Sequence, residues 1–359
     1  MSDSLAQTEK SLTECWCGNS NFTSYGPDYM HCLTCDTLVS QKGLSHDQTQ
    51  VTNDEDDFYG KKYWLDHQQQ DLSQPGILER ARTDIPERNL YWLEALLKYK
   101  LPPATTLELG CAHGSFVALM QQTCFSASGM EMSPWVVDYA RKTFAIDVHL
   151  GPIESVDIPA ASLDCIVMMD VMEHLPDPMA SMSHIQTLLK PDGIFLIQMP
   201  NFCEDRYETL IETQNPFLVQ LKADEHLFLY SKRASQEFFH RIGFEYIYFE
   251  PAIFSHYDMF FVASRIPLQT NTKQEIEASL LATPGGRIIL GMLDLKKQLE
   301  QARMFEHDRN LLRAQLADLR QHFENSEKDR EARAEIIEEQ GKEIGLLHVH
   351  LHELMKKCR

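Results

Sequence analysis

The sequence predicts an α/β fold whose main domain is a doubly wound, largely parallel sheet. The first observation behind this prediction is an alternation of apolar runs with helical stretches, the order that builds parallel βαβ units. The expected strands lie at residues 105–109, 126–130, about 147–150, 165–169 and 194–199.

The second observation is a glycine turn directly after the first apolar run. Gly110-Cys111-Ala112-His113-Gly114 leads into a helix-like run at 116–122. Glycines let the backbone approach a ligand closely, and a helix N-terminus offers free N–H groups. The next run leads to Glu131, where a carboxylate can accept hydrogen bonds from both hydroxyls of a ribose.

Composition narrows the class of protein. A length of 359 residues suits one to three domains, and a net charge of −20 argues against a broad nucleic-acid-binding surface. No run approaches about 18 uninterrupted apolar residues, and the N-terminus lacks a basic region followed by an apolar one. We therefore expect no membrane span and no secretory signal. Cysteines scattered outside one cluster suit the reducing cytoplasm.

The N-terminal part predicts a small metal module. Residues 1–14 are polar and are expected to be a disordered tail, and residues 15–40 hold two close cysteine pairs. Such pairs are typical of a zinc ribbon with four thiolates. The predicted ligands are Cys15, Cys17, Cys32 and Cys35. The first pair has one spacer residue instead of the usual two, so His31 could replace a thiolate, and a degenerate site without metal remains an alternative.

The chain then reaches the main domain. Residues 41–56 are polar and acidic and are interpreted as a linker. Between Ile77 and Tyr99 a helical apolar stripe precedes the first strand, and prolines at 102–103 end it.

A third segment supplies the most specific motif. Residues 163–178 read LDCIVMMDVMEHLPDP, and residues 188–199 read LLKPDGIFLIQM. With the glycine turn and Glu131, these residues resemble class I S-adenosylmethionine (SAM)-dependent methyltransferases. The similarity is greatest to the branch that contains ubiquinone-biosynthesis methyltransferases and many sugar methyltransferases of bacterial glycan clusters. It covers roughly residues 57–265.

The resemblance implies a Rossmann-like, seven-stranded methyltransferase sheet. The runs at 244–249 and 259–263 become the terminal strands, with the last one inserted antiparallel, and a helix at about 231–242 precedes them. Residues 201–229 form a long insertion after the fifth strand. An aromatic segment at 57–64 either folds over the cofactor, as in the family, or docks the linker on the core.

The resemblance also implies the cofactor contacts. Glu131 would hold the ribose, the glycine turn would meet the methionine end, and Glu108 would orient that turn or the ammonium group. Pro152 stands where relatives carry an acid that holds adenine, so the Ile153 backbone takes that role. The implied SAM-binding residues are Glu108, Gly110, Cys111, Gly114, Glu131, Met132, Ile153 and Asp170.

The implied catalytic residues are His226, Asp170 and His174. His226 would be the general base, although it could instead cap the insertion. Asp170 would lie near the sulfonium, and His174 would brace the loop with its neighbouring glutamate. His113, within the glycine turn, is expected to pack the loop.

The predicted activity is O-methylation of a sugar hydroxyl in bacterial surface-glycan or related glycan biosynthesis. Zinc ribbons of this kind precede the catalytic domain in a group of sugar methyltransferases. One alternative is C- or N-methylation of a small molecule or nucleotide sugar. Another is a non-catalytic scaffold of a glycan-assembly complex.

The C-terminal part predicts a coiled coil. Residues 266–287 are interpreted as a polar linker, and residues 288–359 as a coiled coil. From Leu312 to Leu354, thirteen positions alternate by four and three, and nine of them are apolar. The polar ones fall mid-segment, which indicates a weakened centre. We expect a homo-oligomer through the two leucine-rich ends, with a solvated single helix or one folding back on the globular part as alternatives.

Overall fold

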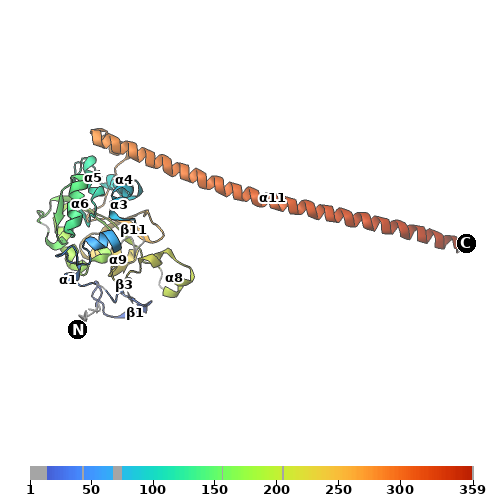
Figure 1. Ribbon diagram of the computed structural model, residues 1–359, viewed down its shortest axis with the longest axis horizontal. Helices are drawn as coiled ribbons and strands as arrows, with labels where there is room; N and C mark the ends of the chain where they lie inside the picture. The colour runs from blue at the N-terminus through green and yellow to red at the C-terminus, as the bar shows by residue number, and fades with distance from the viewer. Residues whose placement is uncertain (1–13, 43, 68–74, 156, 204–205, 358–359) are drawn as a thin grey trace. The chain divides into compact units, whose positions relative to one another are not determined.

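The computed structural model describes residues 14–42, 44–67, 75–155, 157–203 and 206–357. The chain divides into two compact units, one up to Leu293 and one from Asp294 onward, and each is described by itself (Figure 1). The predicted tail at 1–14 falls almost wholly outside the described residues. No helix in the described part of the chain is long and apolar enough to cross a membrane.

The first unit is built on a seven-stranded sheet of order β10-β11-β8-β7-β4-β5-β6. Four neighbouring pairs are parallel, and β11 runs antiparallel to both β8 and β10. This confirms the predicted sheet, including the inserted last strand. The strands are β4 (Thr105–Leu109), β5 (Ser126–Glu131), β6 (Val148–Leu150), β7 (Leu163–Met169), β8 (Leu189–Pro200), β10 (Tyr246–Glu250) and β11 (Asp258–Ser264).

Helices cover both faces of this sheet, which explains the continuous apolar strands. In β7, Ile166 and Met168 join the core that contains α7 and α9, whereas Cys165 and Val167 join the core that contains α4 and α5. The helices are α3 (Ile77–Asp84), α4 (Leu90–Tyr99), α5 (Ser115–Gln122), α6 (Pro134–Phe144), α7 (Pro178–Ile185) and α9 (Lys232–Arg241). The shorter turns are η1 (Tyr63–His67), η2 (Ile85–Asn89), η3 (Ile153–Ser155), η4 (Met172–His174) and η5 (Gln186–Leu188).

The N-terminal strands belong to a sheet that also includes a distant strand. Strands β1 (Phe22–Tyr25), β2 (Tyr29–Cys32) and β3 (Thr37–Ser40) make a sheet whose fourth strand is β9 (Phe228–Tyr230), from the long insertion. All four residues of β3 are buried. The predicted zinc-ribbon-like segment at 15–40 therefore shares its sheet with a distant segment of the chain.

The insertion has its own small core. It contains α8 (Tyr207–Glu212), η6 (Pro216–Gln220) and β9. Buried residues of the insertion and of the N-terminal strands pack in one cluster, namely Tyr25, Tyr29, Leu38, Phe202, Leu210, Phe217, Ala223 and Leu229. The insertion therefore joins the N-terminal sheet to the main domain.

The predicted linker at 41–56 is wrong as a linker, since it packs on the main domain. It holds α1 (His46–Thr49), which Ser45 begins with a capping box, and Thr49 is buried. The carboxylate of Asp54 accepts hydrogen bonds from Ser133 Oγ at 2.8 Å and Trp135 N at 2.6 Å. Asp54 thus satisfies donors at the start of α6, a position that favours negative charge.

The predicted linker at 266–287 is also corrected. It contains α10 (Lys273–Leu281), which begins at a Thr272/Glu275 capping box, and the start of α11 (Pro284–Lys357). Leu280 and Ile289 are buried in the core beside α4 and α5. The first unit consequently extends to Leu293 and not to residue 265.

The second unit is a single helix. Residues 294–357 continue α11 without a break (Figure 1). Its large apolar side chains are exposed, for example Leu316 at 49% and Leu319 at 66%. A row of exposed leucines is the pattern that a partner helix covers, so the coiled coil stays a prediction.

Candidate active site

Two adjoining cavities open where the parallel strands end. Their volumes are about 210 and 150 Å³, and five residues line both: Tyr63, Trp64, Gly110, Asp170 and His174. Gly110 follows β4 and Asp170 follows β7, so the shared wall lies at the carboxyl edge of the sheet, where ligands bind in open α/β folds. The first two of these residues belong to the aromatic segment at 57–64.

The smaller cavity contains three of the predicted cofactor residues, Glu131, Met132 and Ile153. The Glu131 carboxylate accepts hydrogen bonds from the backbone N–H groups of Met132 at 2.8 Å, Ser133 at 3.1 Å and Ala112 at 3.2 Å. Burial raises the pKa of Glu131, and these three donors oppose that rise. The fixed carboxylate is suited to accept further hydrogen bonds from a diol.

The two glycines of the turn have different roles. Gly110 has φ +64° and lines both cavities; a Cβ there would lie 2.7 Å from Val171 Cγ2. Gly114 has φ +79° and lines neither of these cavities, and its Cβ would lie 2.2 Å from Ile146 Cδ1. This glycine lets the start of α5 pack against Ile146, and its implied SAM contact stays a prediction.

The larger cavity has a buried carboxyl oxygen at the glycine turn. Glu108 Oε2 has no hydrogen-bond partner among the described residues, although this side chain is buried. Burial raises the pKa of Glu108 well above its usual value. Cys111 lines the same cavity. A cationic ligand group beside Oε2 would stabilise the ionised form of this buried carboxyl group.

The larger cavity is also lined by two arginines, Arg80 and Arg88, that the sequence analysis missed. Arg80 Nε is 3.1 Å and Arg88 Nε is 3.7 Å from the carboxylate of Asp84. The same carboxylate binds His113 Nε2 at 3.0 Å, so His113 packs the loop as expected. Arg88 Nε is buried beyond hydrogen-bond distance of any described partner, which suits an anionic ligand group. The signal was an arginine–aspartate–arginine row at i, i+4 and i+8 in a helical stretch.

The predicted catalytic residues meet in the larger cavity. Asp170 has φ +57°, and its Oδ1 accepts a hydrogen bond from Gln198 Nε2 at 3.3 Å. His226 Nδ1 lies 2.7 Å from the Gln220 carbonyl, so Nδ1 carries the proton and Nε2 keeps a lone pair. His174 Nδ1 lies 2.9 Å from the Glu225 carbonyl. This pairing braces the loop with the insertion.

The environment keeps His226 neutral. Burial lowers its pKa well below 6.5, and the neighbouring His174 and Lys222 add to this shift. Burial likewise lowers the pKa of His174. Glu173, His174 and His226 each place one ligand atom within 4.8 Å of the others. These donors could share a proton or hold a divalent cation.

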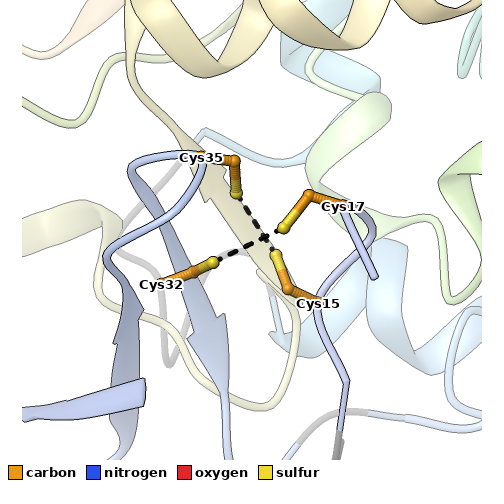
Figure 2. A group of neighbouring side chains, drawn as sticks. All are labelled: Cys15, Cys17, Cys32 and Cys35. Carbon is orange, nitrogen blue, oxygen red and sulfur yellow. Dashed lines mark hydrogen bonds between the residues drawn. The ribbon is translucent and has the colours of Figure 1, made fainter. Parts of the chain in front are cut away.

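The four cysteines also come together. Figure 2 shows their sulfur atoms pointing toward one another, with Cys15–Cys35 at 3.5 Å and Cys17–Cys32 at 3.6 Å. Tetrahedral zinc with Zn–S bonds of about 2.3 Å separates thiolates by roughly 3.8 Å, so the four sulfurs fit this ion. His31 lies outside the group and binds Asp36 Oδ1 at 2.9 Å.

The buried histidines predict a pH dependence of stability. The pKa values of His174 and His226 are below 6.5 in the folded chain, whereas unfolded histidines titrate near 6.5. Below pH 6.5 the unfolded state binds more protons than the folded state. The free energy of unfolding therefore decreases as the pH is lowered, by up to about 1.4 kcal/mol per pH unit for each histidine. Thermal unfolding between pH 7.5 and 5.0 measures this slope. His226→Gln should flatten it, while exposed His240→Gln should not; equal slopes for all three proteins would contradict the prediction.

Comparisons with known proteins agree with this geometry. Residues 81–248 match the family described as "Methyltransferase domain". The chain is 28% identical over 130 residues to a "Probable S-adenosylmethionine-dependent methyltransferase" of Mycolicibacterium smegmatis, covering 34% of this chain and 50% of that protein. It is 28% identical over 109 residues to a "Ubiquinone biosynthesis O-methyltransferase" of Xanthomonas campestris pv. campestris, covering 28% and 45%.

A third relative is a "Trans-aconitate 2-methyltransferase" of Azoarcus sp., 30% identical over 121 residues and covering 33% of this chain and 48% of that protein. The chain spans about half the length of these curated relatives. The matched region contains β4, β5 and β7. It also contains Gly110 and Asp170, which line both cavities. Residues 81–248 are therefore similar to a methyltransferase domain, and the relatives matched over this region include SAM-dependent methyltransferases.

Proposed function

We propose that the protein transfers the methyl group of SAM to a hydroxyl oxygen of a sugar in glycan biosynthesis. The single observation that supports O-methylation is His226, which lines the larger cavity with Nδ1 bound to the Gln220 carbonyl, beside the smaller cavity proposed for the cofactor. A relative described as an O-methyltransferase supports the same reaction type.

The two cavities divide SAM between them. Glu131 accepts hydrogen bonds from the ribose hydroxyls in the smaller cavity, and the Ile153 backbone meets adenine. The unpaired carboxylate of Glu108 suits the ammonium group of the methionine end, and Arg88 suits its carboxylate. Asp170 lines both cavities, so it lies where the sulfonium would bridge them.

SAM supplies an activated methyl group on a sulfonium, a good leaving group. The acceptor oxygen attacks the methyl carbon in line, the new C–O bond forms as the C–S bond breaks, and the hydroxyl proton passes to His226 Nε2. Alignment of the reacting atoms contributes up to about 7–11 kcal/mol. The chain's residues thus orient both partners, and His226 takes the proton.

A sugar acceptor suits the lining of the larger cavity. Trp64, Phe254 and Tyr257 line it with aromatic rings, while Asp170 and Asp258 offer hydrogen-bond acceptors or donors. Burial beside Asp170 raises the pKa of Asp258 to about 8, so this carboxyl carries a proton at neutral pH and can donate. Rings with neighbouring carboxyls match the faces and hydroxyls of a pyranose.

Two other functions remain distinguishable. C- or N-methylation of a small molecule or nucleotide sugar would not need a base at His226 for a hydroxyl proton. A non-catalytic scaffold of a glycan-assembly complex need not bind SAM at all. Calorimetric titration with SAM separates the scaffold from both enzymes, and the unpaired Glu108 and Arg88 atoms favour binding.

The acceptor is tested with radiolabelled methyl-SAM, purified protein and an extract of the source organism. The extract is separated into glycan, protein, nucleic-acid and small-molecule fractions. Label in the glycan fraction that is lost with Glu131→Ala supports the proposal. Label in another fraction would show that the acceptor belongs to a different class of molecule. No label in any fraction, together with no SAM binding, would favour the scaffold.

The four cysteines are proposed to bind one structural zinc ion. Zinc thiolate centres contribute on the order of 10 kcal/mol to small modules, and Asn19 Nδ2 donates to Cys32 Sγ at 3.3 Å as an outer partner. Metal analysis of the purified chain should find one zinc per chain. Cys32→Ser should lower that ratio, whereas exposed Cys124→Ser should not; a zinc-free wild-type protein would contradict the assignment.

The second unit is proposed to form a parallel homodimeric coiled coil. In that arrangement each core position meets its own copy, so the leucine-rich layers stack on each other and the polar layers stay together. The polar centre contains Arg330 and Arg333, which pair with Glu327 and Asp329 of their own helix at 2.7 Å. The polar centre therefore weakens the coiled coil, but its two arginines keep ion-pair partners within their own helix.

Replacing Arg330 and Arg333 together by Leu should strengthen dimerisation at least about tenfold. Each buried leucine contributes about 1.5–3 kcal/mol. Sedimentation equilibrium measures the dimer dissociation constant. Lys328→Leu, on the outer face of the same turn, is the matched control and should leave the constant unchanged. Monomers at every concentration for the double variant would contradict a coiled coil.

A further inference from the structure

The segment that carries His226 is held by the N-terminal strands. Tyr29 Oη donates to the His226 carbonyl at 3.0 Å, although the two residues are 197 positions apart. Ser40 Oγ donates to the Ala223 carbonyl at 2.6 Å, and Ser40 N donates to the Leu227 carbonyl at 2.9 Å. Three carbonyls within residues 223–227 are thus fixed from the N-terminal side.

The main domain also holds this segment through hydrogen bonds. Leu227 N donates to the Glu173 carbonyl at 2.8 Å, and His174 Nδ1 donates to the Glu225 carbonyl at 2.9 Å. The Glu225 side chain accepts from Tyr63 Oη at 3.2 Å. The position of His226 therefore depends on both sides, and Tyr29 on the N-terminal strands donates the hydrogen bond to its backbone carbonyl.

The four-cysteine centre lies at the other end of these strands. Thr37 Oγ1 accepts from Trp16 Nε1 at 2.9 Å and lies 3.2 Å from Cys35 Sγ. In the β3–β9 pairing, Thr37 is opposite Tyr230, and the Trp16 ring packs 6.2 Å from that tyrosine. A continuous path of contacts runs from the cysteines through β3 to β9 and the residues just before it.

The strands on this path are too short to be stable in isolation. β2 and β3 have four residues each, and β9 has three. Short strands without a large core need an added constraint such as a metal. Small displacements of a catalytic group cost rate steeply, since about 1 Å can cost 10²-fold.

We propose that Tyr29 is a positioning residue for His226 and that the four-cysteine centre anchors the strands on which Tyr29 stands. This inference rests on the proposed role of His226 as base. It assigns the metal no part in the chemistry. The proposed SAM contacts at Glu131 and Ile153 lie on other elements. The Tyr29–His226 hydrogen bond is therefore expected to affect methyl transfer and not cofactor binding.

The test uses Tyr29→Phe in the full chain, with exposed Tyr246→Phe as the matched control. Tyr29→Phe should lower kcat about tenfold, since one hydrogen bond is lost and the imidazole shifts. The dissociation constant for SAM and the zinc content should stay within about twofold of wild type. The control should change none of these.

A second readout does not depend on activity. NMR of histidine-labelled protein, with the His226 signal identified by its loss in His226→Gln, should show that signal shifted or broadened in Tyr29→Phe and unchanged in Tyr246→Phe. Removal of zinc by Cys35→Ser should broaden the same signal. An unchanged His226 signal in Tyr29→Phe overturns the positioning role.

The two proposals fail in different ways. If His226→Gln keeps full activity, the proposed base is wrong, and the NMR signal alone decides whether Tyr29 positions the imidazole. If His226→Gln loses activity while Tyr29→Phe keeps kcat and the signal, the base stands and the positioning role is overturned.

Discussion

Replacing His226 by Gln lowers kcat for methyl transfer by about 10²–10⁴-fold, the usual contribution of a positioned general base. Gln keeps the size and a hydrogen-bonding group but cannot take the hydroxyl proton. The dissociation constant for SAM should stay unchanged, because the proposed cofactor contacts, such as Glu131 at the end of β5, do not include His226. Single-turnover rates with labelled SAM, together with calorimetry, measure the two quantities separately. Exposed His240→Gln is the control and should keep full activity.

The pH profile of kcat gives the same residue a second test. Burial and two neighbouring groups, His174 and Lys222, hold the pKa of His226 well below 6.5. Its neutral form is the base, so activity should not fall until the pH drops well below 6.5. Wild-type activity that rises with a midpoint near 6.5 would show an ordinary, exposed histidine. Full turnover by His226→Gln would show that His226 is not the general base.

Glu131→Ala raises the dissociation constant for SAM by about 10²-fold. Two charge-assisted hydrogen bonds to the ribose are each worth about 1.5 kcal/mol or more, and about 1.4 kcal/mol corresponds to tenfold in affinity. The change also leaves three backbone N–H groups without their acceptor. Isothermal titration measures the affinity directly.

The matched control for Glu131→Ala is Glu245→Ala, an exposed carboxylate next to β10. It should leave SAM binding unchanged. Affinity retained by Glu131→Ala would mean that the cofactor does not lie in the smaller cavity. Affinity lost by both variants would point to a general loss of fold, which circular dichroism detects.

The main sheet could be predicted from the sequence because its signals are local. The apolar run at 105–109 coincides with β4, and the glycine turn and Glu131 follow their strands as expected. In contrast, β8 begins at Leu189, five residues before the predicted run, because Lys190, Pro191 and Asp192 interrupt the apolar pattern. Local polarity hid the start of that strand.

The features that could not be predicted are contacts between distant segments. Nothing in Leu38 or Leu229 indicates that the two residues face each other across β3 and β9. The cavity role of Arg88 likewise depends on the approach of its helix to the glycine turn. Gly114 was assigned to the cofactor by its place in a motif, which does not indicate the close approach of Ile146. Side-chain packing, which no spacing encodes, decided each case.

Strand β9 has one consequence for how the chain can be divided. Its three residues Phe228–Tyr230 are buried, and within the described residues β3 is its neighbour in the sheet. A chain shortened to begin at residue 57 would lose that neighbour and present an open, apolar strand edge. Such edges template association between molecules. The methyltransferase part would therefore aggregate when expressed without its N-terminal strands, and solubility, not turnover, would be the first property to fail.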